Sequence, residues 1–129
     1  MAKTIFILYV REQGRSTKFY CEVLGREPVL NVPGMTEFEL DGGASLGLMP
    51  EQGICSLLGA VLPDPAGARG VPRAELYLSV EGAKDHHRRA LIAGAKELSP
   101  TMDRPWGDRV SYVLDPDSHV LAFAESIPA

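Results

Sequence analysis

The sequence predicts an α+β fold in which one βαβββ unit occurs twice. Two observations lead to this prediction: strand-like and helix-like segments follow the same order in both halves of the 129-residue chain, and matching positions recur about seventy residues apart. The recurring positions are Val10 with Val80, Gly25 with Gly94, and Leu40 with Leu114, each leucine being followed by a turn. Similarity at a fixed interval indicates an internal duplication.

In the first half, TIFILYV is rich in β-branched and aromatic residues and predicts a strand. The next segment, REQGRSTKFYCEVLG, predicts a helix with Ser16 as its cap, Phe19 and Tyr20 on its apolar face, and Gly25 at its end. EPVLNV, MTEFEL and ASLGLM follow, separated by the turn sequences PG and DGG. These three segments predict short antiparallel strands.

In the second half, AELYLSV predicts a strand, residues 81–93 a helix that ends at Gly94, and KELSP a short strand. DRVSYVL and HVLAF then predict a hairpin around the turn DPDS. We therefore expect one domain, residues 1–129, made of modules 1–49 and 74–125. The connection, residues 50–73, is too rich in Pro and Gly for a regular element except a turn of helix at residues 54–58, and it is either a surface linker or a lid.

Composition excludes several classes of protein. The chain has 13 basic and 17 acidic residues and a net charge of −4, which argues against a nucleic-acid surface and gives no support to binding of anionic membranes. No apolar run approaches the roughly 20 residues of a membrane span, and no cleavage-site pattern follows MAKTIFILYV. Cys21 and Cys55 match no metal-site spacing and are expected to be reduced thiols, so we expect a cytoplasmic protein.

The motif order resembles the vicinal oxygen chelate superfamily, which includes glyoxalase I, extradiol dioxygenases, fosfomycin-resistance enzymes and bleomycin-resistance proteins. The motifs are RSTKFYCEVLG after the first strand and WGDRVSYVLDPDSHVLAF at the end, and the resemblance covers nearly the whole chain. It implies that the two modules form a curved mixed sheet around a ligand cavity, with the helices outside. It also implies a homodimer, because the family usually pairs modules across chains and half-sheets leave edges to cover.

The resemblance places the family's metal ligands, typically His or Glu, on the first and last strands of each module. The matching positions here are Ile5, Gly47, Glu75 and Ala122, and only Glu75 has a coordinating side chain. A catalytic metal needs about three protein ligands. A shift of the alignment by one residue brings in no ligand either, so we expect no metal, and no other cofactor is indicated.

The remaining polar residues of the motifs have structural explanations. His86 and His87 stand among charged residues on the second helix, which predicts a solvated helix face. His119 follows the DPDS turn, and Asp115 and Asp117 are interpreted as turn formers rather than acid–base catalysts.

Alternation of side chains along each strand separates two faces. The face expected to be a helix-covered core contains Phe6, Leu8, Val10, Phe38, Leu40, Leu46, Leu48, Leu76, Leu78, Val80, Leu121 and Phe123. The other face is expected to bind the ligand, and its candidate residues, with the nearby tryptophan, are Ile5, Ile7, Tyr9, Glu37, Glu39, Gly47, Met49, Glu75, Tyr77, Trp106 and Ala122. Glu37 and Glu39 could instead reach solvent, and Trp106 either stacks on an aromatic ligand or packs at a sheet edge.

These expectations favour a metal-independent small-molecule binding protein of the glyoxalase/bleomycin-resistance type that sequesters an aromatic or cationic ligand. The alternative is an enzyme that uses Glu75 as its catalytic residue, either lactoylglutathione-lyase-like, dioxygenase-like, or a metal-free enzyme in which Glu75 abstracts a proton. Glu75 lies in an otherwise apolar strand, so we expect it to be buried and either paired with Arg73 or Arg109 or to have a raised pKa.

Overall fold

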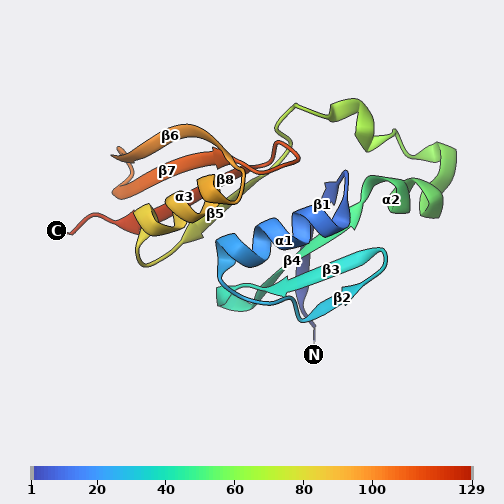
Figure 1. The fold of residues 1–129 in the computed structure, drawn as a ribbon, viewed down its shortest axis with the longest axis horizontal. Coiled ribbons are helices and arrows are strands. Elements are labelled where there is room, and N and C mark those ends of the chain that lie inside the picture. The colour runs from blue at the N-terminus through green and yellow to red at the C-terminus, as the bar shows by residue number, and fades with distance from the viewer. Residues whose placement is uncertain (1, 129) are drawn as a thin grey trace. The chain divides into compact units, whose positions relative to one another are not determined.

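The computed structural model describes residues 2–128 (Figure 1). Within these residues the chain forms two compact units, one of residues 2–21 and 25–69 and the other of residues 22–24 and 70–128. Each unit contains one four-stranded mixed sheet, with strand order β1-β4-β3-β2 in the first and β5-β8-β7-β6 in the second. The same order of pairing in both units confirms the repeated βαβββ plan. Within the described residues, no helix is long and apolar enough to cross a membrane.

The first unit begins with β1 (Thr4–Val10) and α1 (Gln13–Leu24), followed by β2 (Leu30–Val32), β3 (Met35–Glu39) and β4 (Ala44–Pro50). β1 pairs with β4 in parallel, whereas β2, β3 and β4 form an antiparallel meander. The parallel pair requires a crossover, and α1 with the meander provides it.

Helix α1 begins three residues before Ser16, so the prediction of Ser16 as its cap is wrong. Glu12 is the N-cap: its backbone is extended (φ −142°, ψ 112°) and its carboxylate accepts a hydrogen bond from the backbone N–H of Arg15 at 3.3 Å. Ser16 is instead buried in the first part of the helix. The helix ends as predicted at Gly25, whose φ of 66° suits a residue without a Cβ.

The core of the first unit lies on the helix-covered face of its sheet. Phe38, Leu46 and Leu48 have no exposed surface, and the Tyr20 ring of α1 lies 6.5 Å from the ring of Phe38. Phe6 departs most from the predicted core, because 60% of its surface is exposed, and Leu40 is half-buried. Phe6 lies on an edge strand, where a side chain has neighbours on one flank only.

The connection between the modules contains more regular structure than the sequence predicted. An α-helix, α2, spans Glu51–Leu58, and 3₁₀ turns follow at Gly59–Val61 (η2) and Pro65–Ala68 (η3). A salt bridge of 2.6 Å between Arg69 and the buried carboxylate of Glu51 holds the two ends of this segment together. The Glu51 carboxylate lies in the first turn of α2, where a negative charge favours helix formation.

The second unit contains β5 (Glu75–Ser79), α3 (Ala83–Ile92), β6 (Lys96–Asp103), β7 (Asp108–Leu114) and β8 (Val120–Ser126). β5 and β8 are parallel, and β6, β7 and β8 are antiparallel. β6 is longer than the predicted KELSP strand, and its register against β7 shifts twice. The Asp115 carboxylate accepts hydrogen bonds from the backbone N–H groups of Asp117 and His119, which confirms the predicted turn.

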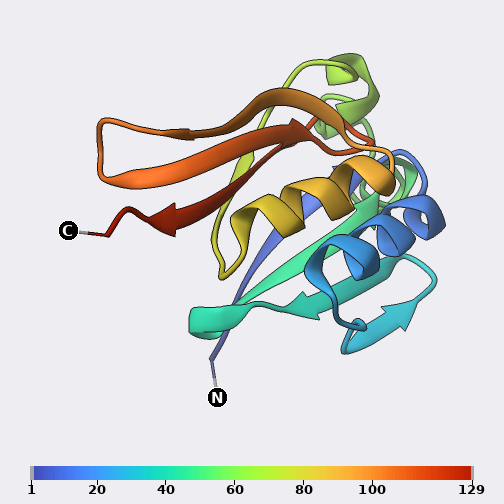
Figure 2. The same cartoon turned by 60° about the vertical axis from the view of Figure 1, so that its left-hand side comes forward.

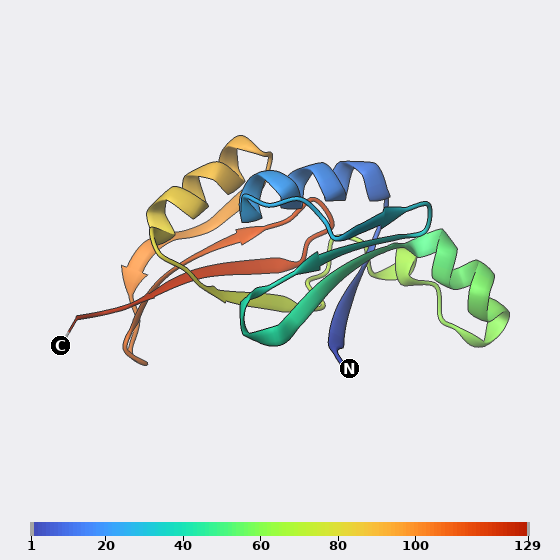
Figure 3. The ribbon, with the colours of Figure 1, turned by 90° about the horizontal axis from the view of Figure 1, so that it is seen from below.

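Helix α3 packs on β7 and β8 (Figure 2), and its buried residues recur at helical spacing: Ala83, His87 and Ala90. The prediction that both histidines are solvated is therefore wrong for His87, which is 8% exposed and whose Nε2 lies 2.7 Å from Glu97. Each of α1 and α3 lies on one face of its own sheet (Figure 3).

Candidate functional site

The predicted ligand-binding residues share one face within each unit, opposite the helix-covered core. The register places Ile7, Gly47 and Glu37 side by side in the first sheet, and we call this face the first open face. In the second sheet, Tyr77, Ala122 and Tyr112 lie side by side on what we call the second open face. Because alternate residues of a strand share a face, the first open face also contains Ile5, Tyr9, Glu39 and Met49, and the second also contains Glu75.

The first open face is closely packed around Gly47. A Cβ atom at position 47 would lie 3.0 Å from Ile7 Cγ1, 3.2 Å from Ile5 Cγ2 and 3.4 Å from Met35 Sδ. The two separations from isoleucine carbon atoms are shorter than ordinary van der Waals contacts, and the one from Met35 Sδ is an ordinary contact. The side chains of neighbouring strands therefore fill the centre of this face.

The two acidic residues of the first open face differ in burial and in pairing. Glu37 is buried, and its carboxylate accepts a hydrogen bond from Lys3 Nζ at 2.6 Å. The bond from Lys3, followed by one from Ser45, lowers the pKa of Glu37 against the opposing effect of burial. Glu39 is exposed, in agreement with the solvent alternative. The charge of Glu37 is thus already matched within the unit.

The second open face consists of aromatic side chains beside small ones. Ala122 and Ala124 lie on the central strand β8 and are 0% and 1% exposed, and Tyr112 packs against them and Val110. Tyr77 lies directly beside Ala122 on β5 and is 40% exposed. Alanines at the centre leave room for aromatic side chains from the neighbouring strands to extend over the sheet.

A chain of hydrogen bonds fixes the aromatic groups of the second open face. The indole Nε1 of Trp106, in the turn between β6 and β7, donates to the hydroxyl of Tyr77 at 2.8 Å. That hydroxyl donates to Asp108 Oδ2 at 2.5 Å. Burial first, and then the bond to Asp108, raises the pKa of Tyr77, while the bond from Trp106 acts in the opposite direction. The phenol therefore stays protonated near neutral pH and remains a donor.

Trp106 keeps 57% of its surface exposed although its polar atom is satisfied. A tryptophan that packed at a sheet edge would cover most of its ring, so this exposure favours the stacking interpretation of the sequence analysis. A ring held by its N–H and accessible on its surface is suited to contact with a flat ligand.

Glu75 does not have the environment predicted for it. Its side chain is exposed, and it forms no ion pair or hydrogen bond with any residue from 2 to 128. Arg73 donates instead to the backbone carbonyls of Val71 and Asp117, and Arg109 pairs with Asp103 at 2.7 Å. The expectation of a buried, paired Glu75 is wrong because β5 is an edge strand whose residues 75, 77 and 79 are exposed.

Sequence reasoning missed three residues of the second open face: Arg104, Asp108 and Tyr112. Tyr112 and Asp108 were within reach of the parity argument, because both lie on the strand that pairs with Ala122 and its neighbours. Alternation along strands could not have indicated Arg104, because this residue lies outside the strands, in the turn after β6.

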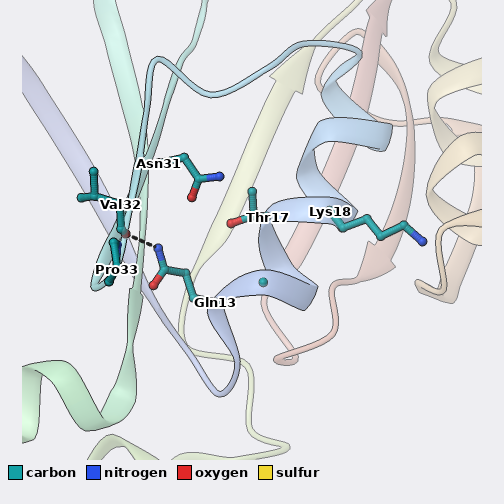
Figure 4. A pocket seen from close by; sticks show the side chains of 7 residues that line it. Gln13, Thr17, Lys18, Asn31, Val32 and Pro33 are labelled. Atoms are coloured by element: carbon teal, nitrogen blue, oxygen red, sulfur yellow. Dashed lines mark hydrogen bonds between the residues drawn. The ribbon is translucent and has the colours of Figure 1, made fainter.

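A separate surface pocket of about 440 Å³ lies between the start of α1 and the β2–β3 turn (Figure 4). Gln13 spans it, donating to the carbonyl of Val32 at 2.8 Å and accepting from the backbone N–H of Gly34 at 2.9 Å. Thr17 and Asn31 both bond to the buried hydroxyl of Thr36. These polar groups form the hydrogen bonds that join the helix to the hairpin. We therefore interpret the pocket as a structural junction and not as a ligand site.

The positions that match the family's metal ligands do not fit a metal. Ile5, Gly47 and Ala122 have no donor atom, and a side chain at position 47 would require Ile5 and Ile7 to shift. Across residues 2–128 no group of three or more His, Cys, Asp or Glu side chains is placed to hold an ion. The absence of a metal stays a prediction, which elemental analysis of the purified protein would test.

Comparisons with known proteins agree with this architecture. The model of the Glyoxalase/Bleomycin resistance protein/Dioxygenase superfamily matches residues 4–123. A glyoxalase-related enzyme from Fulvimarina pelagi is similar with a TM-score of 0.81 at 24% identity, over 98% of this chain and 88% of that chain. Protein ATC0852 from Agrobacterium tumefaciens has a TM-score of 0.75 at 27% identity, over 99% of both chains.

A glyoxalase/bleomycin resistance protein/dioxygenase family enzyme from Burkholderia phytofirmans PsJN has a TM-score of 0.82 at 15% identity, over 98% of this chain and 100% of that chain. Among the curated proteins no match was found. At these identities the solved structures establish a shared fold.

Proposed function

Because the chain belongs to the Glyoxalase/Bleomycin resistance protein/Dioxygenase superfamily, we propose that it is a metal-independent small-molecule binding protein that holds an aromatic ligand on its second open face. The observation that carries the proposal is the Trp106–Tyr77–Asp108 chain of hydrogen bonds. It fixes two partly exposed aromatic rings beside a central strand of alanines. Binding sites for small molecules commonly combine aromatic walls with a few fixed polar groups.

Preorganisation explains why this arrangement favours binding. Each aromatic side chain has one polar atom held by a neighbour, so a ligand that stacks on it does not have to fix it first. Immobilising a flexible side chain on binding costs about 0.5–1.5 kcal/mol. Rings that are already fixed avoid part of that cost.

Glu75 is the group proposed to bind a cationic substituent of the ligand. It lies two residues from Tyr77 on the same face of β5, and its carboxylate has no partner in the described chain. A carboxylate at the edge of an aromatic surface attracts a ligand ammonium group, and such a charge-assisted hydrogen bond contributes about 1.5–3 kcal/mol.

The experiment is a thermal-shift screen of planar aromatic compounds, with cationic, neutral and anionic members, followed by calorimetry of the hits. We expect saturable binding of one molecule per chain, lost in Trp106→Ala and in Tyr77→Ala. Ile92→Ala, at an exposed apolar residue on α3, is the matched control and should bind as the wild type does. No saturable binding by any compound contradicts the proposal, and chemical conversion of a bound compound favours the enzyme alternative.

We also propose that the chain forms a homodimer. Support comes from large apolar side chains left exposed in the first unit: Phe6 on the edge strand β1 and Leu57 and Val61 in the connection are 60%, 70% and 86% exposed. Flat edge strands and exposed apolar groups favour association. Sedimentation at micromolar concentration should give twice the chain mass of 14.0 kDa, and a mass of one chain contradicts the dimer.

A further inference from the structure

Arg104 has an unusual position on the second unit. It follows β6, and its side chain folds back along the hairpin instead of extending to solvent. Its Nη2 donates to Ser99 Oγ at 2.6 Å and to the carbonyl of Val110 at 2.9 Å, and Nε donates to the same carbonyl at 3.3 Å. The register of β6 against β7 shifts between Ser99 and Met102, so the guanidinium bonds to the strands where their regular pairing is interrupted.

The guanidinium also lies against the aromatic surface of the second open face. Arg104 Cζ is 5.2 Å from the centre of the Tyr112 ring, within the range of a cation–π contact. Tyr112 is directly beside Ala122 and Ser99 in the sheet, which places the stacked pair on the second open face. Arg104 is half-buried, and its position is fixed by the backbone, a hydroxyl and an aromatic ring together.

No carboxylate neutralises Arg104 within residues 2–128, and its Nη1 makes no hydrogen bond there. Arg109, five residues later, shows the contrast, because Asp103 pairs with it at 2.7 Å. An arginine presents its N–H groups in a rigid fork that matches the two oxygens of a carboxylate. Arg104 therefore combines a fixed, uncompensated positive charge with a free donor nitrogen beside an aromatic surface.

We infer that Arg104 binds a carboxylate group of the aromatic ligand on the second open face. This inference rests on the proposed function and adds the chemical class of the ligand: a planar aromatic acid whose carboxylate lies toward β6. Glu75 is exposed on the opposite edge strand, β5, so salt screens its repulsion of a carboxylate bound at Arg104. In a ligand with a carboxylate at one end and an ammonium at the other, the carboxylate would pair with Arg104 and the ammonium with Glu75.

The test compares 2-naphthoate with 2-naphthamide by calorimetry, because the two probes share a ring system and differ in charge. The wild-type protein should bind 2-naphthoate at least tenfold more tightly than 2-naphthamide. Arg104→Gln should remove this difference and leave 2-naphthamide binding nearly unchanged. Arg104→Lys keeps the charge without the fork and should retain a smaller preference, and Arg109→Gln, the matched control, should retain the full one.

The outcomes separate this inference from the proposed function. Equal affinity of the two probes for the wild type contradicts the role of Arg104 and leaves aromatic binding intact. If Arg104→Gln weakens the binding of both probes to the same extent, Arg104 only stabilises the hairpin, and this result also contradicts the inference. If neither probe binds the wild type but another compound of the screen does, the inference fails and aromatic binding stands; if no compound of the screen binds, both fail. The wild-type comparison needs no variant, so poor folding of Arg104→Gln does not prevent a decision.

Discussion

The two open faces have the same place in the repeated βαβββ plan but different contents. On the first, aliphatic side chains meet over Gly47, and the carboxylate of Glu37 is paired with Lys3. On the second, the central strand carries alanines, the flanking strands carry tyrosines, and the charges of Glu75 and Arg104 are unmatched within the described chain. A duplicated architecture can therefore keep its cores alike while one face becomes packed and the other keeps unsatisfied groups.

This difference is the reason for proposing a ligand on the second open face and not on the first. A face whose polar groups are already paired offers a ligand little, since its binding must first break existing interactions. A face with fixed rings and unmatched charges offers new contacts without that cost.

Enlarging a side chain should separate the two faces most clearly. Gly47→Leu places a branched side chain among Ile7, Ile5 and Met35, and overpacking of this kind lowers the free energy of unfolding by about 1–3 kcal/mol. Ser79→Leu, on the exposed part of the second open face, should change it by less than about 0.5 kcal/mol. Urea denaturation measures both. A neutral Gly47→Leu would mean that the first face is open enough to hold a ligand.

The charge of Glu75 should matter for binding and little for folding. Glu75→Gln keeps the shape of the side chain and should weaken binding of 2-naphthylmethylammonium about tenfold, equivalent to about 1.4 kcal/mol. The free energy of unfolding should change by less than about 0.5 kcal/mol, because the carboxylate has no partner among the described residues. Calorimetry measures the affinity, and urea denaturation measures the free energy of unfolding. A large loss of stability with unchanged affinity would assign Glu75 to a structural ion pair.

The pH dependence of stability should follow Glu37. The hydrogen bond from Lys3 lowers its pKa in the folded state below the usual 4.5, so the folded protein binds this proton less tightly than the unfolded chain does. Its contribution is present above pH 4.5 and is lost as the pH falls through the lowered pKa. In Glu37→Gln, the decline of melting temperature between pH 5 and pH 3 should be shallower. Glu39→Gln, at an exposed acid of the same strand, is the control and should keep the wild-type slope.

We predict that neither open face holds a metal ion. Elemental analysis of the purified protein should find no stoichiometric Zn, Ni, Mn or Fe, because Ile5, Gly47 and Ala122 offer no donor atoms. About one tightly held metal per chain, lost in Glu75→Ala, would contradict this prediction.

Patterns in the sequence were sufficient to predict the order of elements, the duplication and the division of each sheet into two faces. These follow from local patterns: β-branched runs, the glycine at the end of α1, and alternation along strands, which placed Phe38, Leu46 and Phe123 in the core. The same alternation placed Tyr77 and Ala122 on one face of the second sheet, where the two residues lie side by side. The start of α1 and the length of α2 were missed, because a glutamate cap and a helix bounded by prolines and glycines give weak local signals.

The pairing of polar side chains depends on the tertiary structure and could not be predicted from the sequence. Glu37 is neutralised by a lysine 34 residues away, Glu75 is left exposed at a sheet edge, and His87 lies on the buried stripe of its helix. Tyr77 reaches Asp108 across an intervening strand, and the side chain of Arg104 folds back onto Tyr112. Strand order, register and bulges bring these groups together, and such features depend on contacts between residues far apart in sequence, which no local pattern records.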